Sequence, residues 1–489
     1  MMRVVGLVVA MLTAGNARAE EGPYSNFLVG ERALGLGGAF VAVADDASAV
    51  FHNPGGVGNL STESVSGSMW ALSFSARKLE SGYTTDLGTA ELDHDDVPSL
   101  PLFLAGVFKF GKRDVDGVRR HGLGAILFSP RAYNYTYLAQ IDAAPTMADP
   151  AGIDRLEVRH TDEGRWVGIA YGYRLSRMRL ANPRWDARRG LSLGLSTFLA
   201  SRSISHQEVE IRTREAALSD LPPNALNVRD STLRANARHL VLRLGGIVDW
   251  NRHWRFGAMF QPPGIRVDGE GDTSELFSAV EGTGTQFTTD RAQGLRSNAT
   301  LPWEIRLGAT WLTKPETLLT LDASMLGPAG GTNDPLPLVE TRTTDPFPGV
   351  FVPARTAREV SLRGALGFEL LAWDLFPIRG GLLAELSSSP TIPAKSSEYL
   401  REDINTFGVA LSFGVRTEGY DISVGASALY GVGTGLAVRR SAVDAVPSYD
   451  AANISEQTVF LFVSGGMRAV GQLVEYIEEE AGDKKSPRR

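Results

Sequence analysis

Apolar and polar side chains alternate with a period of two in many segments of the chain from Ser64 onward. The segment 303–312 is typical: one face carries Trp303, Ile305, Leu307, Ala309 and Trp311, and the other carries Glu304, Arg306, Gly308 and Thr310. The same division recurs in 360–370 and 421–428. A period of two indicates β-strands, and in these strands one face suits lipid while the other suits water.

Fourteen segments follow this pattern, and each is at least as long as the roughly 9 to 11 residues with which a tilted strand crosses a bilayer. The predicted strands are 64–76, 99–110, 120–130, 164–175, 190–204, 236–250, 253–267, 298–312, 317–326, 359–371, 376–387, 405–416, 420–432 and 456–467. An even number of strands is what a bacterial barrel of antiparallel strands requires.

The predicted connections alternate between long and short. The long ones are 77–98, 131–163, 205–235, 268–297, 327–358, 388–404 and 433–455, and the shorter ones are 111–119, 176–189, 251–252, 313–316, 372–375 and 417–419. Outer-membrane barrels sort their loops in this way, with short turns on the periplasmic side. We therefore predict an all-β fold: a 14-stranded antiparallel transmembrane β-barrel with both chain ends in the periplasm. Within 131–163, the segments 133–137 and 156–159 are candidates for strands that continue above the membrane.

Aromatic residues gather at the predicted periplasmic turns. Trp250, Trp254, Trp373, Phe376 and Tyr420 all lie at or beside these turns. Barrels place aromatic girdles at the two membrane interfaces. The alternative interpretation is that these side chains pack in the core of a soluble sheet.

The two ends of the chain differ from the predicted barrel. Residues 1–19 combine Arg3, an apolar run and a small-residue cleavage site, which is the pattern of a secretory signal peptide. We expect 20–63 to fold inside the barrel, 64–467 to form it, and 468–489 to be a periplasmic helical tail with Leu473, Val474 and Ile477 at helical spacing. Beyond the signal no apolar run is long enough for a helical span.

Composition narrows the chemistry that the chain can perform. The chain has 489 residues, 53 glycines and no cysteine, which removes disulfides, thiolate metal sites and cysteine nucleophiles. Removing residues 1–19 takes away two arginines and no acid, so the formal net charge falls from -7 to -9. This balance argues against a nucleic-acid partner.

Catalytic and metal-binding motifs give little support for an enzyme. The run Asp93-His94-Asp95-Asp96 is more typical of a solvated charge cluster than of a metal site. We interpret Gly431–Gly435 as a flexible strand end, because it lacks the strand–turn–helix context of a nucleotide-binding fingerprint. The sequence contains neither a Gly-x-Ser-x-Gly elbow nor a His-Glu-x-x-His motif. We therefore expect no enzymatic activity, no metal and no cofactor.

The segment 30–56 is rich in glycine, apolar, and in need of an enclosing surface. Its glycines at 35, 37 and 38 permit close approach to a barrel wall. Either Asp45 or Asp46 can cap a short helix over 47–51, and Asn53-Pro54 should end that helix because the residue before a proline is disfavoured in helical conformation.

This segment also resembles the N-terminal signature of the FadL/TodX-type family of outer-membrane transporters for long-chain fatty acids and other hydrophobic compounds. The resemblance lies in residues 32–54, which read RALGLGGAFVAVADDASAVFHNP. It implies that the segment is a hatch in the lumen, with gating by an Asn-Pro-Ala element that matches Asn53, Pro54 and Gly55. Glycine replaces alanine at 55, which widens the backbone space open to that turn. In the family, ligands leave sideways through an opening at a kink in an early strand.

The resemblance implies passive uptake of a fatty acid or another hydrophobic small molecule by a monomer surrounded by outer-membrane lipid. Inward arginines are the candidate partners for a carboxylate: Arg243, Arg306 and Arg363 foremost, with Arg379 and Arg416. The alternative is that they pair with inward acids such as Glu304, Asp322, Glu369 and Glu385 and brace the lumen. A second possible function is that of an outer-membrane barrel component of a secretion or assembly system, which binds a protein partner.

Overall fold

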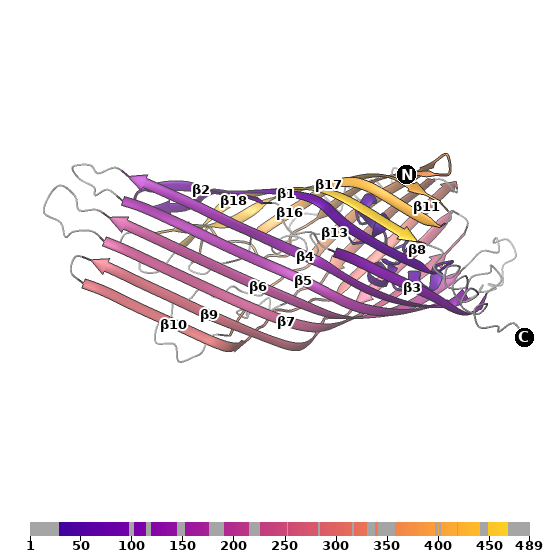
Figure 1. Ribbon diagram of the computed structural model, residues 1–489, viewed down its shortest axis with the longest axis horizontal. Helices are drawn as coiled ribbons and strands as arrows, with labels where there is room; N and C mark the ends of the chain where they lie inside the picture. Colours follow the sequence, from indigo (N-terminus) through magenta and orange to yellow (C-terminus); the bar gives the residue numbers. More distant parts are fainter. Residues whose placement is uncertain are drawn as a thin grey trace, which may run out of the picture.

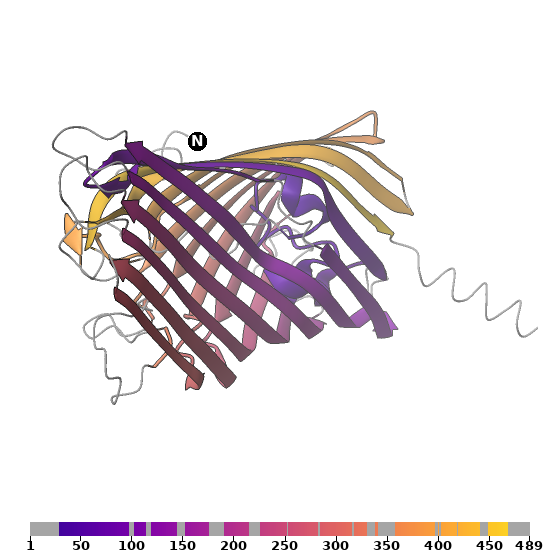
Figure 2. The ribbon, with the colours of Figure 1, turned by 60° about the vertical axis from the view of Figure 1, so that its left-hand side comes forward.

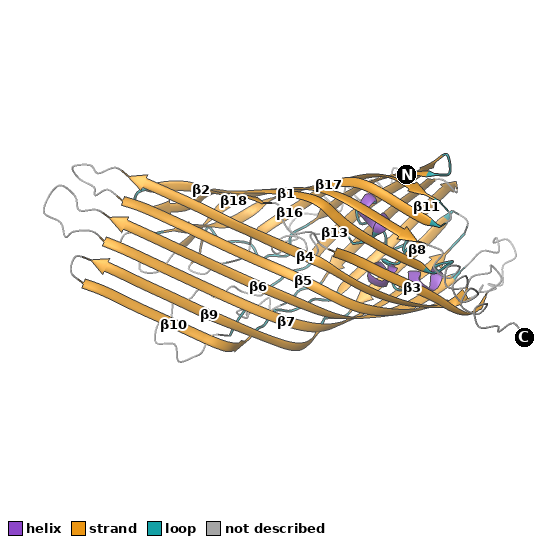
Figure 3. Ribbon diagram, viewed as in Figure 1, coloured by secondary structure: helices purple, strands orange, loops and turns teal. Residues whose placement is uncertain are grey.

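The computed structural model describes residues 29–467, except for 97–101, 114–118, 144–151, 176–189, 215–224, 252, 282–283, 315–316, 330–337, 341–356, 397–399, 401, 418 and 441–447. Within these residues eighteen strands form one sheet that closes on itself as a β-barrel (Figures 1 and 3). Three short helices of the described part lie inside it. The predicted signal peptide (1–19) and helical tail (468–489) lie outside the described residues.

The helices are α2 (Glu31–Gly35), α3 (Ala49–His52) and α4 (Gly55–Asn59). The strands are β1 (Ser64–Thr85), β2 (Gly88–Asp96), β3 (Leu102–Arg113), β4 (Arg119–Ala143), β5 (Gly152–Leu175), β6 (Leu191–Arg214), β7 (Ala225–Asp249), β8 (Trp254–Gln261), β9 (Ile265–Glu281), β10 (Gly284–Arg296), β11 (Glu304–Lys314), β12 (Thr317–Leu326), β13 (Ser361–Ala372), β14 (Phe376–Glu385), β15 (Lys395–Ser396), β16 (Asp403–Arg416), β17 (Tyr420–Arg439) and β18 (Ser448–Met467).

Antiparallel pairing runs around the barrel without a break. The order is β1, β3, β4, β5, β6, β7, β8, β11, β12, β13, β14, β16, β17 and β18. The ring closes where β18 pairs with β1, from Val65 opposite Met467 to Leu79 opposite Ile454. Closure leaves no free sheet edge around this ring, which is the condition for a sheet to lie in hydrocarbon.

Several strands extend far beyond their predicted ends. The predicted loop 131–163 is mostly strand, because β4 continues to Ala143 and β5 begins at Gly152. The loop predicted over 205–235 is shortened at both sides by β6 and β7, and most of 268–297 is the hairpin of β9 and β10. The Gly431–Gly435 segment is also not a strand end, since β17 runs through it. The bounds predicted for these loops and for this strand end were wrong, whereas the strand extensions suggested over 133–137 and 156–159 are confirmed.

The outer face of β5 shows why its predicted strand began only at residue 164. Near the end of the strand the outward side chains are apolar, as in Val167, Ile169 and Tyr171, and these are exposed. Earlier in the strand the outward positions carry Arg155 and Arg159 instead. Alternation continues, but its outward residues change from apolar to charged where the wall leaves the apolar belt. A search for apolar outward positions therefore ends at that level.

Two other predicted strands have different bounds. The segment 253–267 divides into β8, which ends at Gln261, and β9, which begins at Ile265. The last predicted segment of this pair, 298–312, begins as a strand only at Glu304. Pro262, Pro263 and Pro302 interrupt the ladder, because proline has no backbone N–H to donate.

The barrel has two distinct ends. We call the end where β1 begins and β18 ends the proximal end, and the end where β4 stops and β5 begins the distal end. The helices lie toward the proximal end (Figure 1). Trp250, Trp254, Trp373, Phe376 and Tyr420 are all exposed at strand ends or turns, with Trp373 exposed by 87%. Exposure on this scale contradicts the alternative that they pack in a soluble core.

Among the described residues, no helix is long and apolar enough to cross a membrane.

An arginine placed in the apolar belt tests where the lipid lies. Replacing Ile169, whose side chain points outward with an exposed fraction of 62%, should destabilise the folded barrel in a bilayer by about 2–4 kcal/mol. Thr161→Arg is the matched control, because Thr161 also lies in β5 but beyond the belt. Urea unfolding in lipid vesicles measures the difference; equal losses for both variants would contradict the assignment.

Candidate functional site

The residues 29–60, which we call the luminal segment, fill the proximal half of the barrel. Figure 2 shows this segment and its helices enclosed by the strands. Nearly every residue in it is buried. Helix α2 packs against β14, β16, β17, β18 and β1, whereas α4 packs against β4, β5, β6 and β7. The segment therefore contacts the wall on opposite sides of the lumen.

Short-range polar contacts shape the luminal segment. Helix α3 ends at His52 and Asn53 is extended, as expected for a residue before proline. The Asp46 carboxylate accepts hydrogen bonds from the backbone N–H of Ser48 at 2.7 Å and from its hydroxyl at 2.5 Å, which forms an Asx turn before α3. Asp45 instead forms an ion pair with Arg32.

Asn53 joins two parts of the segment to the wall. Its side-chain amide donates to the carbonyl of Val41 at 2.9 Å and to the carbonyl of Gly246 in β7 at 3.0 Å. Its side-chain oxygen accepts from the N–H of Gly55 at 3.0 Å. All three side-chain groups of this buried residue are used, so Asn53 fixes the turn at Pro54 against β7.

Glycines in the wall allow the segment to lie at backbone contact distance. At each of these inward positions a Cβ atom would meet atoms of the luminal segment at 3.0 Å or less. They are Gly122 in β4, Gly172 in β5, Gly194 in β6, Gly245 in β7, Gly257 in β8, Gly308 in β11, Gly367 in β13 and Gly381 in β14. The sequence marks Gly308 and Gly367 as inward-facing; their role as a seat for the segment appears only in three dimensions.

Gly55 itself has a steric explanation. A Cβ atom at this position would lie 2.8 Å from the Cα of Gly246 and 3.0 Å from the carbonyl oxygen of Ser192. Both neighbours are backbone atoms of the wall, which cannot move aside as a side chain can. Gly55, which stands where the Asn-Pro-Ala element has alanine, therefore permits close packing on β6 and β7.

A buried ionic cluster holds α2. Arg32 pairs with Glu369 of β13 at 2.8 Å. Glu369 also pairs with Arg379 at 2.7 Å and with Arg416 at 2.9 Å. The same two arginines bind Asp421 of β17, each at 2.7 Å. Every charge in this cluster has an opposite partner, as burial demands.

Charged side chains also bind backbone groups of the segment. The carboxylate of Asp322 in β12 accepts from the N–H groups of Phe40 at 2.6 Å and Val41 at 2.7 Å. Lys109 in β3 donates to the carbonyls of Val57 at 3.2 Å and Gly58 at 2.7 Å. Sequence reasoning missed Arg32 and Lys109; the signal available for Lys109 was a lysine at an inward position of an otherwise apolar alternation.

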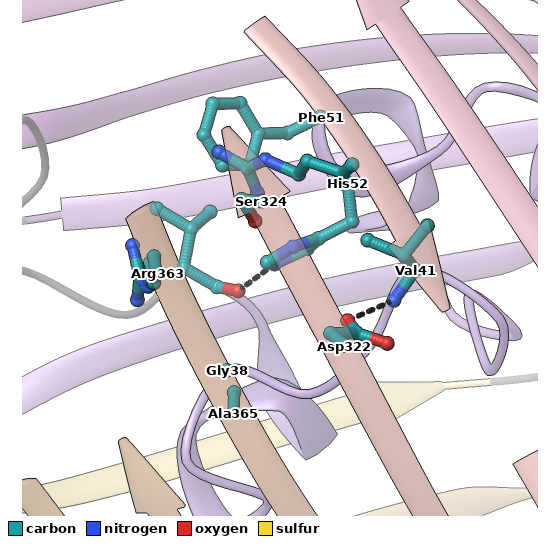
Figure 4. A pocket seen from close by; sticks show the side chains of 10 residues that line it. Gly38, Val41, Phe51, His52, Asp322, Ser324, Arg363 and Ala365 are labelled. Atoms are coloured by element: carbon teal, nitrogen blue, oxygen red, sulfur yellow. Dashed lines mark hydrogen bonds between the residues drawn. The ribbon is translucent and has the colours of Figure 1, made fainter. Parts of the chain in front are cut away.

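The three arginines singled out in the sequence lie together. Arg243, Arg306 and Arg363 all line a cavity of about 40 Å³. Its other walls include Phe51, Trp166, Leu301, Pro302 and Leu326. A neighbouring cavity of about 20 Å³ is also lined by Phe51, Arg306 and Arg363, together with His52 and Asp322 (Figure 4). Phe51, Arg306 and Arg363 thus line both cavities.

Each of these arginines also has an acidic partner. Arg243 and Arg306 contact Glu304 at 3.3 Å and 2.5 Å, and Arg363 contacts Glu385 at 3.8 Å. The arrangement therefore contains the bracing ion pairs as well as a cationic cavity wall. The Arg363 pair is the longest, which leaves its guanidinium the most weakly held of the three.

His52 remains neutral beside these arginines. Burial, together with the positive charge of Arg306, lowers the pKa of His52 to about 3. Its Nε2–H donates to the carbonyl of Val29 at 2.5 Å (Figure 4). His52 thus donates a hydrogen bond within the luminal segment and carries no charge of its own beside the arginines at neutral pH.

Aromatic rings form the apolar side of the site. Phe51, Phe128, Trp166 and Phe198 are buried and contact one another, with ring centroids 4.6 to 6.4 Å apart. The Arg243 guanidinium lies 4.0 Å from the centroid of the Phe51 ring. A cation over an aromatic face is a favourable contact, so the cationic and apolar walls meet at Phe51.

The described residues contain no group of three or more His, Cys, Asp and Glu side chains placed to hold a metal ion. The Asp93–Asp96 run lies in β2, where the His94 ring contacts the backbone of Thr136.

Replacing Gly55 with alanine should displace the luminal segment from β7. The added Cβ meets backbone atoms, so we expect a loss of about 1–3 kcal/mol of stability from overpacking. In the unsubstituted chain the backbone N–H of residue 55 donates to Asn53. Hydrogen exchange at this N–H should become faster in the variant. Gly364→Ala is the control, since a Cβ there has no neighbour within 4 Å; unchanged exchange in Gly55→Ala would contradict the steric argument.

No family model matches the sequence, and no curated protein matches it. Solved structures do match its fold. A Pseudomonas aeruginosa FadL homologue aligns with a TM-score of 0.56 at 10% identity, over 92% of this chain and 99% of that one. The toluene transporters TodX of Pseudomonas putida and TbuX of Ralstonia pickettii both align with a TM-score of 0.53. TodX is 14% identical over 90% of this chain and 98% of its own, and TbuX is 13% identical over 91% and 99%. The chain therefore resembles the FadL- and TodX-type outer-membrane transporters and shares their fold.

Proposed function

We propose that this protein takes up hydrophobic small molecules, such as long-chain fatty acids or aromatic hydrocarbons, passively across the bacterial outer membrane. The observation that carries this proposal is the apolar interior of the barrel. A porin has a polar, water-filled lumen, whereas the lumen of this barrel contains large buried hydrophobic clusters. The toluene transporters with this fold support an apolar ligand.

The two largest clusters follow one another along the barrel. The distal cluster contains Tyr135, Tyr137, Leu156, Ile404 and Tyr449 among its members. The proximal cluster surrounds α3 and α4 and includes the aromatic rings that contact Phe51. An apolar solute that enters at the distal end meets apolar side chains in both halves and avoids an aqueous crossing.

The cationic cavity is the proposed binding site. Arg243, Arg306 and Arg363 would receive a carboxylate, while Phe51 and Trp166 would contact the hydrocarbon chain. The two cavities of about 20 and 40 Å³ are far smaller than the roughly 300 Å³ of a ligand pocket. Because Phe51 of α3 lines both cavities, a movement of α3 would enlarge the space beside the arginines.

This requirement supports a mobile luminal segment that acts as a hatch, with Asp45, Asp46, Asn53, Pro54 and Gly55 at its turns. Its helices have only four or five residues, so each can break at small cost. Arg32 and Asp45 form a neutral pair within the segment. When they leave together, the two arginines and two acids of the wall cluster still balance.

The bulge in β4 is the proposed site of lateral release. Pairing between β4 and β5 shifts register between Phe128 and Arg131. Pro130 lies in this interval and lines the larger cavity. Because proline cannot donate to the ladder, the pairing of β4 is interrupted beside the proposed binding site, where an apolar solute would pass directly into lipid.

We further propose that the membrane unit is a monomer of fourteen strands, namely the eighteen of the sheet without β2, β9, β10 and β15. The continuous ring of pairings supports this division. The monomer needs no cofactor, and outer-membrane lipid surrounds it. The tail 468–489, which could dock a partner in the alternative role in secretion or assembly, lies outside the described residues, and no observation on the described residues favours that role.

Replacing Arg363 with glutamine should separate the two ligand classes. Loss of one charged hydrogen-bonding partner should reduce fatty-acid uptake about tenfold, equivalent to about 1.4 kcal/mol. Toluene uptake should not change, because toluene has no carboxylate. Radiolabelled uptake in a deletion strain complemented with each variant gives the comparison, with the exposed Arg238→Gln as control. If wild-type protein restores uptake of neither compound, the transport function is wrong.

The Asn53→Ala/Pro54→Ala variant tests the hatch. It removes the bonds to Val41 and Gly246 and should impair uptake while leaving the barrel assembled, as judged by heat-modifiable gel migration. Asn134→Ala, on the outer face of β4, should behave as wild type. Normal uptake by the double variant would indicate a static plug.

A further inference from the structure

The distal tip of β1 leaves the barrel wall. Strand β1 pairs with β18 as far as Leu79 opposite Ile454. Beyond that point Tyr83 and Thr84 pair in parallel with Val438 and Arg439 of β17, which lies one strand further round the barrel. The tip must therefore cross β18 to reach its new partner. We call residues 80–90, the connected ends of β1 and β2, the distal tip.

The crossing occurs at a marked bend. Ser81 has a φ of 50°, a left-handed conformation that is uncommon outside glycine. The pairing of β1 with β2 shifts register between Leu79 and Tyr83 in the same interval. The bend is thus confined to about three residues, Glu80, Ser81 and Gly82, which is the form expected of a hinge.

Polar contacts join the distal tip to the other side of the barrel. The hydroxyl of Tyr83 donates to Glu210 of β6 at 3.0 Å. Asp86 pairs with Arg212 at 2.5 Å and with Arg214 at 2.9 Å, both in β6. Along the ring, β3, β4 and β5 lie between β1 and β6. These contacts therefore reach beyond the neighbouring strand.

Arg440, which directly follows β17, makes a similar connection to β6. Arg440 pairs with Glu210 at 2.8 Å and with Glu208 at 3.5 Å. Its backbone N–H donates to the carbonyl of Thr84 at 2.8 Å. Arg440 thus ties the distal tip, β17 and β6 together. In Figure 2 the connected ends of β1 and β2 lie at the same end of the barrel as the beginning of β18.

Apolar side chains lie beneath these contacts. Tyr83 is completely buried, and it belongs to the same hydrophobic cluster as Tyr135, Ile404 and Tyr449. Polar links thus lie over an apolar interior, so the distal tip covers the entrance to the proposed ligand route.

We propose that the distal tip, residues 80–90, is a lid that opens about Ser81 and Gly82 to admit the hydrophobic solute. The inference rests on the proposed uptake function for its purpose, but its geometry stands independently. The pairs of Asp86 are partly exposed to water, with the carboxylate 36% exposed. Exposed ion pairs stabilise a structure only weakly, so this side of the lid can release without stranding a buried charge.

A disulfide between lid and wall provides the test. The chain has no cysteine, so Thr84→Cys/Arg439→Cys introduces one thiol pair at directly paired positions. Oxidation should abolish fatty-acid uptake, and a phosphine reductant should restore it. Ser75→Cys/Thr458→Cys is the matched control, because it joins β1 to β18 below the hinge, where the two side chains are 3.3 Å apart. Equal uptake by the oxidised lid and control variants would overturn the proposal.

A second readout works even if the protein transports nothing. Ile404, which is 2% exposed beneath the lid, is replaced by cysteine in the same chain as either thiol pair, and the pair is oxidised before labelling. Labelling by a membrane-impermeant maleimide should be slow with the lid locked and faster with the control pair. In a chain that carries Ile404→Cys but no thiol pair, the additional substitution Asp86→Ala should accelerate labelling. Asp142→Ala should not, because Asp142 is an exposed acid of β4. Identical labelling rates for the locked and control proteins would exclude a moving lid, whatever the uptake results.

Discussion

Backbone-to-backbone contact between the luminal segment and the wall is the constraint on which the interior of this protein depends. Eight strands present glycine where a Cβ atom would collide with the segment. Side chains on those positions would push the segment into the lumen and open the site. Because the segment lies so close to the wall, Asp322 and Lys109 of the wall bind its backbone groups, and Asn53 of the segment binds a backbone carbonyl of β7. The same closeness leaves space for only small cavities beside Phe51.

Opposite charges are paired within the wall cluster and also within the luminal segment. The wall cluster of Glu369, Asp421 and two arginines balances by itself, and the segment adds the neutral pair of Arg32 and Asp45. A buried charge without a partner would be costly. Within this cluster the charges would still balance if Arg32 and Asp45 left together, whereas Asp322 and Lys109 would lose the backbone groups that they bind.

The two ends of the lumen are closed by different means. The proximal half is filled by the luminal segment, which is apolar and fits tightly against glycine. The distal end is crossed by the tip of β1 and β2, which is linked by ion pairs and the Tyr83 hydroxyl. Apolar clusters lie between them. A barrel closed at both ends can keep water out of an apolar route while each closure opens in turn.

The sequence by itself determined the barrel, because alternation with period two indicates which face of each strand meets lipid. It also determined the turn at Asn53-Pro54, because a proline restricts the backbone conformation of the residue before it. It also marked Arg243, Arg306 and Arg363 as inward. Only the tertiary structure decided that these three share a cavity, that Gly55 is needed against Gly246, and that β4 to β7 extend far beyond the apolar belt. Such facts depend on pairing register and on contacts between residues up to several hundred positions apart. A local sequence pattern does not indicate which distant segment of the backbone will lie against a given residue.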